Sequence, residues 1–519
     1  MVVPRLDAND LWWLVEERAR CSPEREVAVD EAHRSLTFSE LARRAEGAAA
    51  ALAASGVGEG TRVLWMLPTR IEALVLTAAL ARLGAVQIPL IPVYGEREIG
   101  FVVEQARPEM LVVPAESKRA ELPLLAHRVC VAATRAPELL LLGDRLPEVD
   151  PVSLPARTEP GDDHALRWIF YTSGTTSEPK GALHSDATLA ASARGIDLPH
   201  RFVAEDQVSL VFPYAHIGGP QLLFSALMVG YRLILTEVFD PERVIDTLSA
   251  HGVTLAGPGP AFWQAFIDAQ RRSPQRKLFP ELRALIGGGA AKPGNLQREA
   301  REVLGVEIVS GYGLTECPAL AYNHVGDPDE VLASDGRGVL GVEMRTLRSD
   351  GRPAVPGEEG EICVKGPMLF RGYLDPTLDA GAFDDEGFLR TGDLGCLDAA
   401  GQLRVSGRLK DIIIRKGENI SAKEVEDVLV EHPAVAEAAV VGLPDAARGE
   451  RACAVVVVAE GAASPSLDRL LEHCVAAGLS KAKVPEQLEV VDSLPRNATG
   501  KVMKLTLRER YAAADQPRP

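Results

Sequence analysis

Residues 171–181 carry the most informative local pattern of the chain, Tyr171-Thr172-Ser173-Gly174-Thr175-Thr176-Ser177-Glu178-Pro179-Lys180-Gly181. The run follows an apolar segment at 168–171 that is typical of a buried strand. Small hydroxyl residues and glycine let backbone N–H groups point into one concavity, and Lys180 adds a positive donor. The pattern differs from a Walker A loop, because Gly181 follows the lysine and the glycine spacing is different. We predict a loop that binds a polyphosphate, and an ordinary Ser/Thr/Gly turn is the alternative.

Helix and strand patterns alternate on both sides of this loop. Thr37-Phe38-Ser39-Glu40 matches a capping box and precedes apolar residues at helical spacing. A second helix is predicted at 71–83, and short apolar strands are predicted at 62–67, 86–91, 168–171, 208–212, 232–235, 253–256 and 285–287. Continuous apolar strands separated by helices predict parallel sheets that are covered on both faces. The predicted fold class is α/β, with a large N-terminal domain of parallel sheets over residues 1–409.

The pattern changes near residue 336 and again near residue 410. Polar and apolar residues alternate at 361–365, and glycine and proline are frequent, which predicts a β-rich subdomain over about 336–409. Further on, helices are predicted at 421–431 and 467–475, and strands at 435–441, 452–458 and 487–491. These elements are enough for a separate α+β unit. We therefore predict a separate, small C-terminal domain over 410–519, with the boundary near Lys410.

Charge and cysteine content restrict the classes of partner. Lys plus Arg number 56 and Asp plus Glu number 73, so the formal charge is -17. An acidic surface repels nucleic acids and anionic lipids, and an anionic substrate then needs a local positive pocket. The seven cysteines form no C-x-x-C pair, which favours free thiols in a reducing cytosol.

The sequence gives no sign of export or of a membrane span. The first residues lack the basic start and apolar core of a signal peptide. The most apolar region, 73–93, contains Arg82, Gly84 and two prolines, so we interpret it as helix, turn and buried strand. We expect a cytoplasmic protein without an integral membrane segment.

Two further motifs suit nucleotide chemistry. The first is Gly311-Tyr312-Gly313-Leu314-Thr315-Glu316, which follows a strand-like segment at 306–309. Tyr312 suits stacking on a purine, and Glu316 suits a magnesium ion that bridges phosphates. A β-turn explains its Gly-x-Gly pattern nearly as often. The second is Phe388-Leu389-Arg390-Thr391-Gly392-Asp393, whose carboxylate can accept hydrogen bonds from two ribose hydroxyls; a simple Gly-Asp turn is its alternative.

Two basic motifs lie further along the chain. Gly407-Arg408-Leu409-Lys410-Asp411 falls at the predicted domain junction, and Pro495-Arg496-Asn497-Ala498-Thr499-Gly500-Lys501 lies near the C-terminus. A lysine behind a glycine on a mobile loop can be delivered to a site and withdrawn from it. A solvated surface charge is the alternative for Lys501.

The order and spacing of the five motifs resemble the adenylate-forming (ANL) superfamily of acyl- and aryl-CoA ligases, luciferases and peptide-synthetase adenylation domains. The resemblance covers essentially the whole chain. It also includes Leu36-Thr37-Phe38-Ser39-Glu40-Leu41, Pro213-Tyr214-Ala215-His216-Ile217-Gly218-Gly219 and Gly287-Gly288-Gly289-Ala290.

The resemblance implies a role for each matching residue. The ATP- and AMP-binding residues would be Thr172, Ser173, Gly174, Thr175, Thr176, Lys180, Gly288, Gly289, Ala290, Gly311, Tyr312, Gly313, Thr315, Asp393 and Arg408. The catalytic residues would be Lys501, Thr315, Glu316 and His216. Glu316 would hold the metal, Lys410 would be the hinge, and Gly417 and His216 would line the coenzyme A tunnel.

The resemblance also implies the reaction. A small-molecule carboxylic acid would attack the α-phosphate of ATP with Mg²⁺ present, and pyrophosphate would leave. Rotation of the small domain would then withdraw Lys501 and admit coenzyme A, which would give acyl-CoA and AMP. No nucleophile of the enzyme is required. The family contains monomers and homodimers.

Four positions depart from the family pattern, namely Ser177, Ser310, Asn497 and the segment 415–419. The acid is expected to be a medium- or long-chain fatty, alicyclic or similar degradative acid, held among 214–219, 258–263, 287–290 and 313–321. A stand-alone adenylation enzyme that loads a carrier protein is one alternative. A catalytically silent nucleotide-binding homologue is another, although the chain retains the charged residues that catalysis would need.

Overall fold

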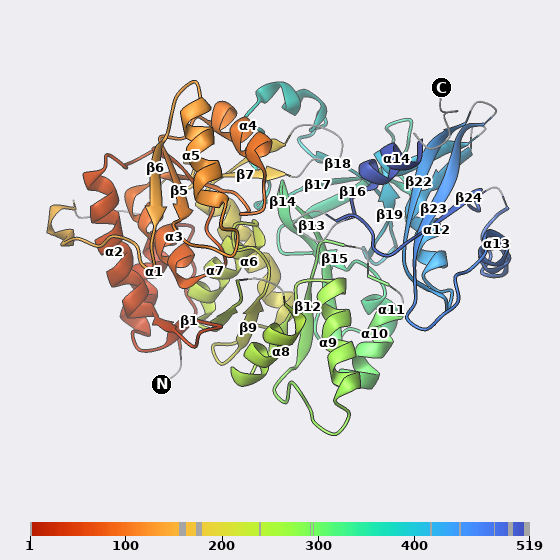
Figure 1. Cartoon of the computed structure of the whole chain (residues 1–519), viewed down its shortest axis with the longest axis horizontal. Helices are drawn as coiled ribbons and strands as arrows, with labels where there is room; N and C mark the ends of the chain where they lie inside the picture. Colours follow the sequence, from red (N-terminus) through yellow and green to blue (C-terminus); the bar gives the residue numbers. More distant parts are fainter. Residues whose placement is uncertain are drawn as a thin grey trace.

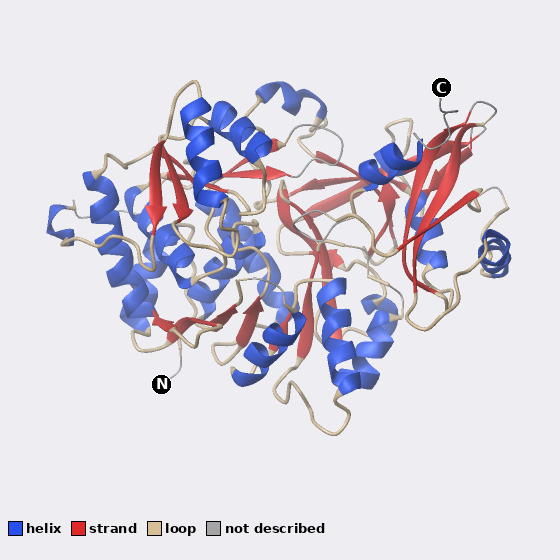
Figure 2. Cartoon of the chain, in the orientation of Figure 1, coloured by secondary structure: helices blue, strands red, loops and turns tan. Residues whose placement is uncertain are grey.

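A computed structural model of the chain describes residues 3–154, 162–172, 179–237, 240–290, 292–293, 295–415, 418–445, 448–481, 483–496 and 502–512. Figure 1 shows a large N-terminal part that carries most of the helices, with the C-terminal domain at one end. The secondary-structure colouring of Figure 2 shows that the sheets of the large part are flanked by helices. The predicted α/β class, with a large domain of parallel sheets and a smaller C-terminal domain, is confirmed. Within the described residues, no helix is long and apolar enough to cross a membrane.

The first sheet has six strands and is parallel except at one edge. Its order is β6 (Glu138–Leu142), β5 (Met110–Pro114), β3 (Arg62–Trp65), β4 (Val86–Pro89), β7 (Trp168–Thr172) and β8 (Lys180–His184), and only β7–β8 is antiparallel. Trp168 and Phe170 of β7 enter one core cluster, while Ile169 and Tyr171 enter another. Apolar residues therefore face both sides of the sheet, as the continuous apolar strands predicted.

Helices cover this sheet on both sides. They are α2 (Phe38–Ala54), α3 (Ile71–Leu83), α4 (Glu96–Ala106) and α5 (Leu122–Ala132). The predicted capping box begins α2, because Thr37 Oγ1 accepts from the Glu40 N–H at 3.2 Å and Glu40 Oε2 accepts from the Thr37 N–H at 2.9 Å. Helix α3 has the predicted bounds and is buried along its first eleven residues, as suits a helix that is apolar on all sides.

The second sheet has nine strands. Its order is β15 (Arg337–Gly338), β14 (Cys317–Tyr322), β13 (Glu307–Leu314), β12 (Ala284–Gly288), β11 (Leu255–Ala256), β9 (Gln207–Leu210), β10 (Arg232–Leu235), β1 (Glu26–Asp30) and β2 (Ser35–Thr37). The strands from β13 to β1 pair in parallel, whereas β14, β15 and β2 are antiparallel to their neighbours. Parallel pairing brings the carboxyl ends of β12 and β13 to one edge, where several of the predicted site residues lie.

Helices also pack against this second sheet. They are α1 (Leu11–Cys21), α6 (Asp186–His200), α7 (Gly218–Val229), α8 (Pro241–Ala250), α9 (Pro260–Arg272) and α10 (Leu296–Glu299). Ile308 of β13 faces a core cluster that includes Trp263 of α9, and the next residue, Val309, faces the opposite cluster. Short segments complete the large part: α11 (Asp329–Leu332), η1 (Pro151–Ser153), η2 (Ala300–Leu304) and η3 (Pro376–Gly381).

Two smaller sheets follow. The predicted β-rich region contains an antiparallel sheet of β16 (Glu343–Leu347), β17 (Gly360–Lys365), β18 (Leu389–Leu397) and β19 (Leu403–Arg408). After the short turn η4 (Leu409–Asp411), the last sheet contains β21 (Glu418–Ser421), β20 (Ile412–Arg415), β23 (Gly449–Val458), β22 (Val435–Asp445) and β24 (Gln487–Val491). It packs with α12 (Ala422–Leu429), α13 (Leu467–Ala476) and α14 (Lys504–Ala512). The change of sheet at η4 is compatible with the predicted boundary near Lys410, which stays a prediction.

Candidate active site

The Gly311–Glu316 motif forms the end of a long hairpin. Strand β13 continues through Gly311 to Leu314, and Leu314 pairs with Cys317 of β14, so Thr315 and Glu316 form the two-residue turn. The prediction that this motif follows a strand ending at 309 was wrong. The strand continues because the glycines admit β14: a Cβ on Gly311 would overlap the ring of Tyr322, and one on Gly313 would overlap the Pro318 carbonyl.

Hydrogen bonds from two other elements hold the Thr315–Glu316 turn. His184 of β8 lies with its Nε2 2.9 Å from the Thr315 carbonyl oxygen. The Phe370 N–H donates to the Glu316 carbonyl at 2.8 Å, and the Tyr373 hydroxyl donates to Glu316 Oε1 at 2.7 Å. The turn therefore presents the two predicted residues in a fixed geometry.

His184 is buried and neutral at ordinary pH. Burial lowers its pKa to about 4, although the bond to the Thr315 carbonyl opposes that shift. A carbonyl only accepts, so the Nε2 atom carries the proton, and Nδ1, 2.9 Å from the Thr188 hydroxyl oxygen, is the unprotonated ring nitrogen. Sequence reasoning missed this residue, although a histidine in an apolar strand directly after Lys180-Gly181 is a signal that was available.

Asp393 lies between Tyr312 and Arg408. Its side chain is only 4% exposed, the Tyr312 hydroxyl donates to its Oδ2 at 2.7 Å, and Arg408 Nε lies 2.9 Å from its Oδ1. Burial, followed by the charge of Asp393, raises the pKa of Tyr312 well above its usual range, so the hydroxyl remains a donor. Asp393 lies inside β18 and pairs with Arg408 of β19, so the alternative of a simple Gly-Asp turn is wrong.

Positive side chains gather beside this carboxylate. The pKa of Lys410 is lowered chiefly by desolvation and then by the charge of Arg408, with Lys180 adding to the effect. Lys180 Nζ lies 5.1 Å from the centre of the Tyr373 ring. Arg408, Lys410 and Lys180 thus lie within electrostatic range of one another in a chain of net charge -17, which provides a local positive region of the kind that an anionic substrate needs.

The glycine segment that was expected to form the adenine slot adjoins the same hairpin. Gly288 pairs with Gly311 across β12 and β13. Gly289 has a φ of 80° and open space where a side chain would be. The structure therefore brings Gly288, Gly289 and Ala290 to the edge that also carries Gly311 and Tyr312.

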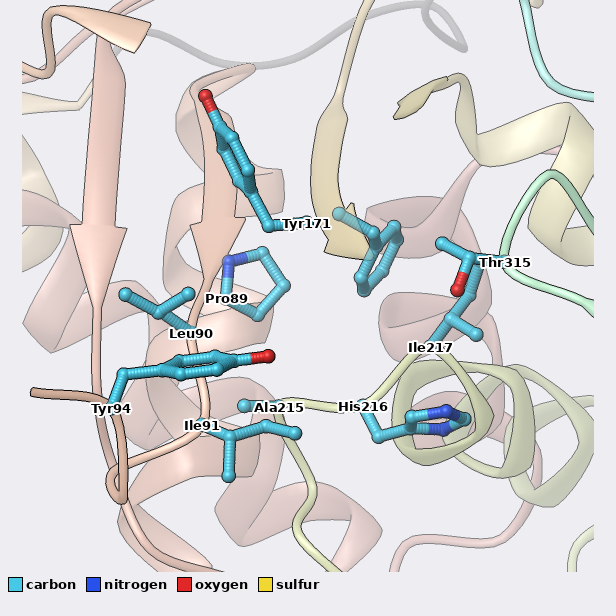
Figure 3. Close-up of a pocket in the computed structure, with 10 residues that line it drawn as sticks. Pro89, Leu90, Ile91, Tyr94, Tyr171, Ala215, His216, Ile217 and Thr315 are labelled. Carbon is cyan, nitrogen blue, oxygen red and sulfur yellow. The ribbon is translucent and has the colours of Figure 1, made fainter. Parts of the chain in front are cut away.

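A small cavity of about 20 Å³ lies between the two large sheets (Figure 3). Thr315 and His216 border it on one side, and Tyr94 directs its hydroxyl toward its middle from the other. His216 Nδ1 accepts from the Gly218 N–H at 3.2 Å, which places the ring proton on Nε2. The complete lining is Pro89, Leu90, Ile91, Tyr94, Phe170, Tyr171, Ala215, His216, Ile217 and Thr315.

This cavity overlaps only part of the expected acyl pocket. Residues 215–217 and Thr315 line it, but 258–263 and 287–290 do not, and Trp263 instead lies in the core. Residues 89–94 were not expected, because they come from the other sheet and share no local pattern with the rest. A volume of about 20 Å³ holds about one water molecule, far less than a carboxylic acid requires.

The residues at Glu316 fit a magnesium ion held mainly by its substrate. Among the described residues, no group of three His, Cys, Asp or Glu side chains could hold a metal. Glu316 offers one carboxylate, and Mg²⁺ commonly takes one or two carboxylates together with phosphate oxygens and water. The donor set therefore suits an ion that arrives with ATP.

Several predicted residues lie outside the described part of the chain. Thr172 ends β7 and pairs with Lys180 of β8, which places the two ends of the predicted phosphate loop side by side. The residues that lie outside are Ser173, Gly174, Thr175, Thr176, Gly417 and Lys501.

Comparisons with known proteins place the chain in a family. The model described as AMP-binding enzyme matches residues 15–374, and the model described as AMP-binding enzyme C-terminal domain matches 424–501. The chain is 32% identical to the medium-chain fatty-acid–CoA ligase of Escherichia coli (strain K12), over 96% of this chain and 89% of that protein. It is 35% identical to the indoleacetate–CoA ligase of Aromatoleum aromaticum, over 94% and 95% of the two chains.

One further curated relative and one solved structure also match the chain. The chain is 31% identical to the salicyl-AMP ligase / salicyl-S-ArCP synthetase of Mycobacterium tuberculosis, over 97% of this chain and 91% of that protein. The crystal structure of ATP-bound MatB from Rhodopseudomonas palustris matches with a TM-score of 0.87 at 30% identity, covering 98% of this chain and 100% of that one. The chain belongs to the AMP-binding enzyme family, within the adenylate-forming acyl-CoA synthetase superfamily.

Proposed function

We propose that the protein activates a carboxylic acid with ATP and transfers the acyl group to coenzyme A. In the first step a carboxylate oxygen bonds to the α-phosphorus, the bond to the β-phosphate oxygen breaks, and pyrophosphate leaves with the electron pair. In the second step the thiol sulfur of coenzyme A, having lost its proton, bonds to the acyl carbon. AMP then leaves with the electron pair of the broken carbon–oxygen bond.

The arrangement around Asp393 carries this proposal. A nearly buried carboxylate, fixed by Tyr312 and Arg408, suits the two hydroxyls of a ribose. The positive charges of Arg408, Lys410 and Lys180 suit phosphates, and the Thr315–Glu316 turn, which ends the hairpin that carries Tyr312, provides a hydroxyl and a carboxylate. Preorganised charges of this kind stabilise the charge that develops on a phosphate in the transition state.

Magnesium, when bound with ATP, would neutralise phosphate charge and help to orient the reacting oxygens. The chain's own residues supply orientation. His184 and the Phe370 N–H hold the backbone of the turn, and Tyr373 holds the Glu316 carboxylate. Positioning of this kind accounts for much of the rate in a reaction that needs no enzyme nucleophile.

Three assignments in the proposal depend on the family resemblance alone. Lys501 would bridge the acid and the α-phosphate, Gly417 would line the coenzyme A tunnel, and Lys410 would be the hinge of a mobile lid. His216 is better supported, because its ring borders the same cavity as Thr315.

The acid itself is proposed only by class. The cavity beside Thr315 is too small for the acid as it stands, but most of the side chains around it are apolar or aromatic, and once widened on binding this lining would suit an apolar chain or ring attached to the carboxylate. The named acids of two relatives, a medium-chain fatty acid and indoleacetate, fall in that class. We propose a fatty, alicyclic or aryl-substituted acid.

Pyrophosphate release with a panel of acids tests the first step. We expect release that requires ATP, Mg²⁺ and an apolar acid, followed by AMP and acyl-CoA when coenzyme A is added. Lys180→Ala should reduce release about a hundredfold, because one charge on the phosphates is lost. Lys277→Ala removes an exposed lysine elsewhere and should behave as the wild type. No release with any acid would reject the proposal.

Loading of a carrier protein is a second candidate, favoured by the name of the salicyl-S-ArCP synthetase relative. The same assay separates the two. Acyl-adenylate that accumulates with coenzyme A present, and disappears only when a phosphopantetheinylated carrier is supplied, would select the carrier.

A further inference from the structure

The segment at 371–374, which follows β17, pairs with β8 through backbone hydrogen bonds and an isolated bridge. The Arg371 N–H donates to the Leu183 carbonyl at 2.7 Å, and the Leu183 N–H donates to the Gly372 carbonyl at 3.0 Å. The Leu374 N–H donates to the Gly181 carbonyl at 2.7 Å, and Ala182 and Tyr373 form an antiparallel bridge. This pairing brings Tyr373 next to the end of the predicted phosphate loop.

Tyr373 touches two charged residues at once. Its hydroxyl donates to Glu316 Oε1 at 2.7 Å, and the centre of its ring lies 5.1 Å from Lys180 Nζ. The ring is 8% exposed and packs edge-on against Phe370, with ring centres 4.8 Å apart. Its backbone N–H also donates to Asp379 at 2.9 Å. Packing and backbone bonds thus fix the position of the side chain.

Lys180 lies over the ring of Tyr373 and Glu316 bonds to its hydroxyl, and these two side chains carry opposite charges. Among the described residues, no ion pair joins them, although both contact Tyr373. Without these two contacts to Tyr373, the Coulomb attraction between the lysine and the carboxylate, which strengthens as their separation falls, would draw them together. Such a pair would occupy the lysine that the phosphates need and the carboxylate that the metal needs.

We propose that Tyr373 is a positioning residue that holds Lys180 and Glu316 apart and keeps both available to ATP. The hydroxyl satisfies and orients the carboxylate, while the negative face of the ring attracts the ammonium group. The inference rests on the proposed function, because it assigns ATP phosphates to Lys180 and a metal to Glu316. Sequence reasoning had passed over the Arg371-Gly372-Tyr373 segment.

Calorimetric titration of ATP, with EDTA and with Mg²⁺, separates the two roles without using catalysis. Tyr373→Phe keeps the ring and removes the hydroxyl. It should bind metal-free ATP as the wild type does, while needing about tenfold more Mg²⁺ for full binding. Tyr373→Leu removes both contacts and should also weaken metal-free binding about tenfold, because Lys180 moves onto Glu316.

A double variant tests the spacer role directly. In Tyr373→Leu/Glu316→Gln the lysine has no carboxylate to approach, so metal-free ATP binding should recover to within about twofold of the wild type. A purely structural role would leave the double variant as weak as Tyr373→Leu. The matched control is Tyr231→Phe, which loses a buried hydroxyl bond of 3.1 Å to the Leu222 carbonyl far from the site.

The results that would overturn this inference differ from the results that would reject the proposed function. Wild-type Mg²⁺ dependence in Tyr373→Phe would overturn the inference even if Tyr373→Leu does not fold, as would a failure of recovery in a folded double variant. ATP binding needs no acid, so a wild type that binds ATP and activates none of the acids would reject only the proposed function.

Discussion

The two sides of the candidate active site are held very differently. On the large-domain side, the Thr315–Glu316 turn receives hydrogen bonds from β8 and from the Phe370–Tyr373 region, and Phe370 itself lies in the core. On the other side, the chain leaves β19 through η4, where Leu409 is 46% exposed. There the Ser421 hydroxyl donates to the Ser406 carbonyl at 2.7 Å.

This difference indicates which side is fixed and which side can change. A turn with three donors from packed elements keeps its geometry, because each bond would have to break inside a core. A junction at which an apolar side chain is exposed to solvent opens at a lower free energy. The contrast supports, on physical grounds, the proposal that nucleotide groups are preorganised while the small domain moves.

Replacing Asp393 should have the largest effect and tests whether the fixed side binds the nucleotide. Asp393→Ala removes the acceptor of Tyr312 and Arg408 and, by the proposal, of both ribose hydroxyls. We expect kcat/KM for ATP to fall about a hundredfold, mainly through KM. Asp398→Ala alters the turn of the same β18–β19 hairpin, where Asp398 accepts from the Ala400 N–H, and should leave KM unchanged. Equal KM values for both variants would remove Asp393 from the nucleotide site.

A change at His184 tests how firmly the turn is held. His184→Leu leaves the Thr315 carbonyl without its donor, so we expect a loss of about 1–3 kcal/mol in the free energy of unfolding at pH 7. The turn should also become less well placed, and kcat should fall about tenfold. His127→Leu, at an exposed position of α5, is the control.

The pH dependence of the same variant has a definite sign. The folded pKa of His184 is about 4, below the unfolded value near 6.5, so the unfolded chain binds its proton first as pH falls. The wild type therefore loses stability from this group between pH 6.5 and 4, by about 3 kcal/mol. His184→Leu lacks this pH-dependent loss. The difference in free energy of unfolding between the variant and the more stable wild type should therefore shrink toward pH 4. A difference that stays constant with pH would show that His184 is not buried and neutral.

Local patterns predicted the elements well and the contacts between them poorly. The capping box and the apolar spacing located α2 and α3, since both signals lie within a few residues. The same logic failed at Gly311, where the partner that decides the conformation, Tyr322, lies on the next strand. Tyr373 and Glu316 are 57 residues apart, so their bond depends on how the 371–374 segment pairs with β8. The family was predicted from five ordered motifs, whereas the positioning residues could be identified only from the fold.

The smallest effect is expected at the junction, and it is measured by comparing an alanine variant of Ser421, which lies at the junction, with one of Ser466, which does not. Each caps a helix, Ser421 at α12 and Ser466 at α13, and either alanine variant should cost the small domain about 1 kcal/mol. Only Ser421 also bonds to the large domain, through the Ser406 carbonyl. Trypsin should therefore cut Ser421→Ala at residues 408–415 about fivefold faster than Ser466→Ala, because opening of the junction costs less. Equal cutting rates in the two variants would mean that this bond does not restrain the junction.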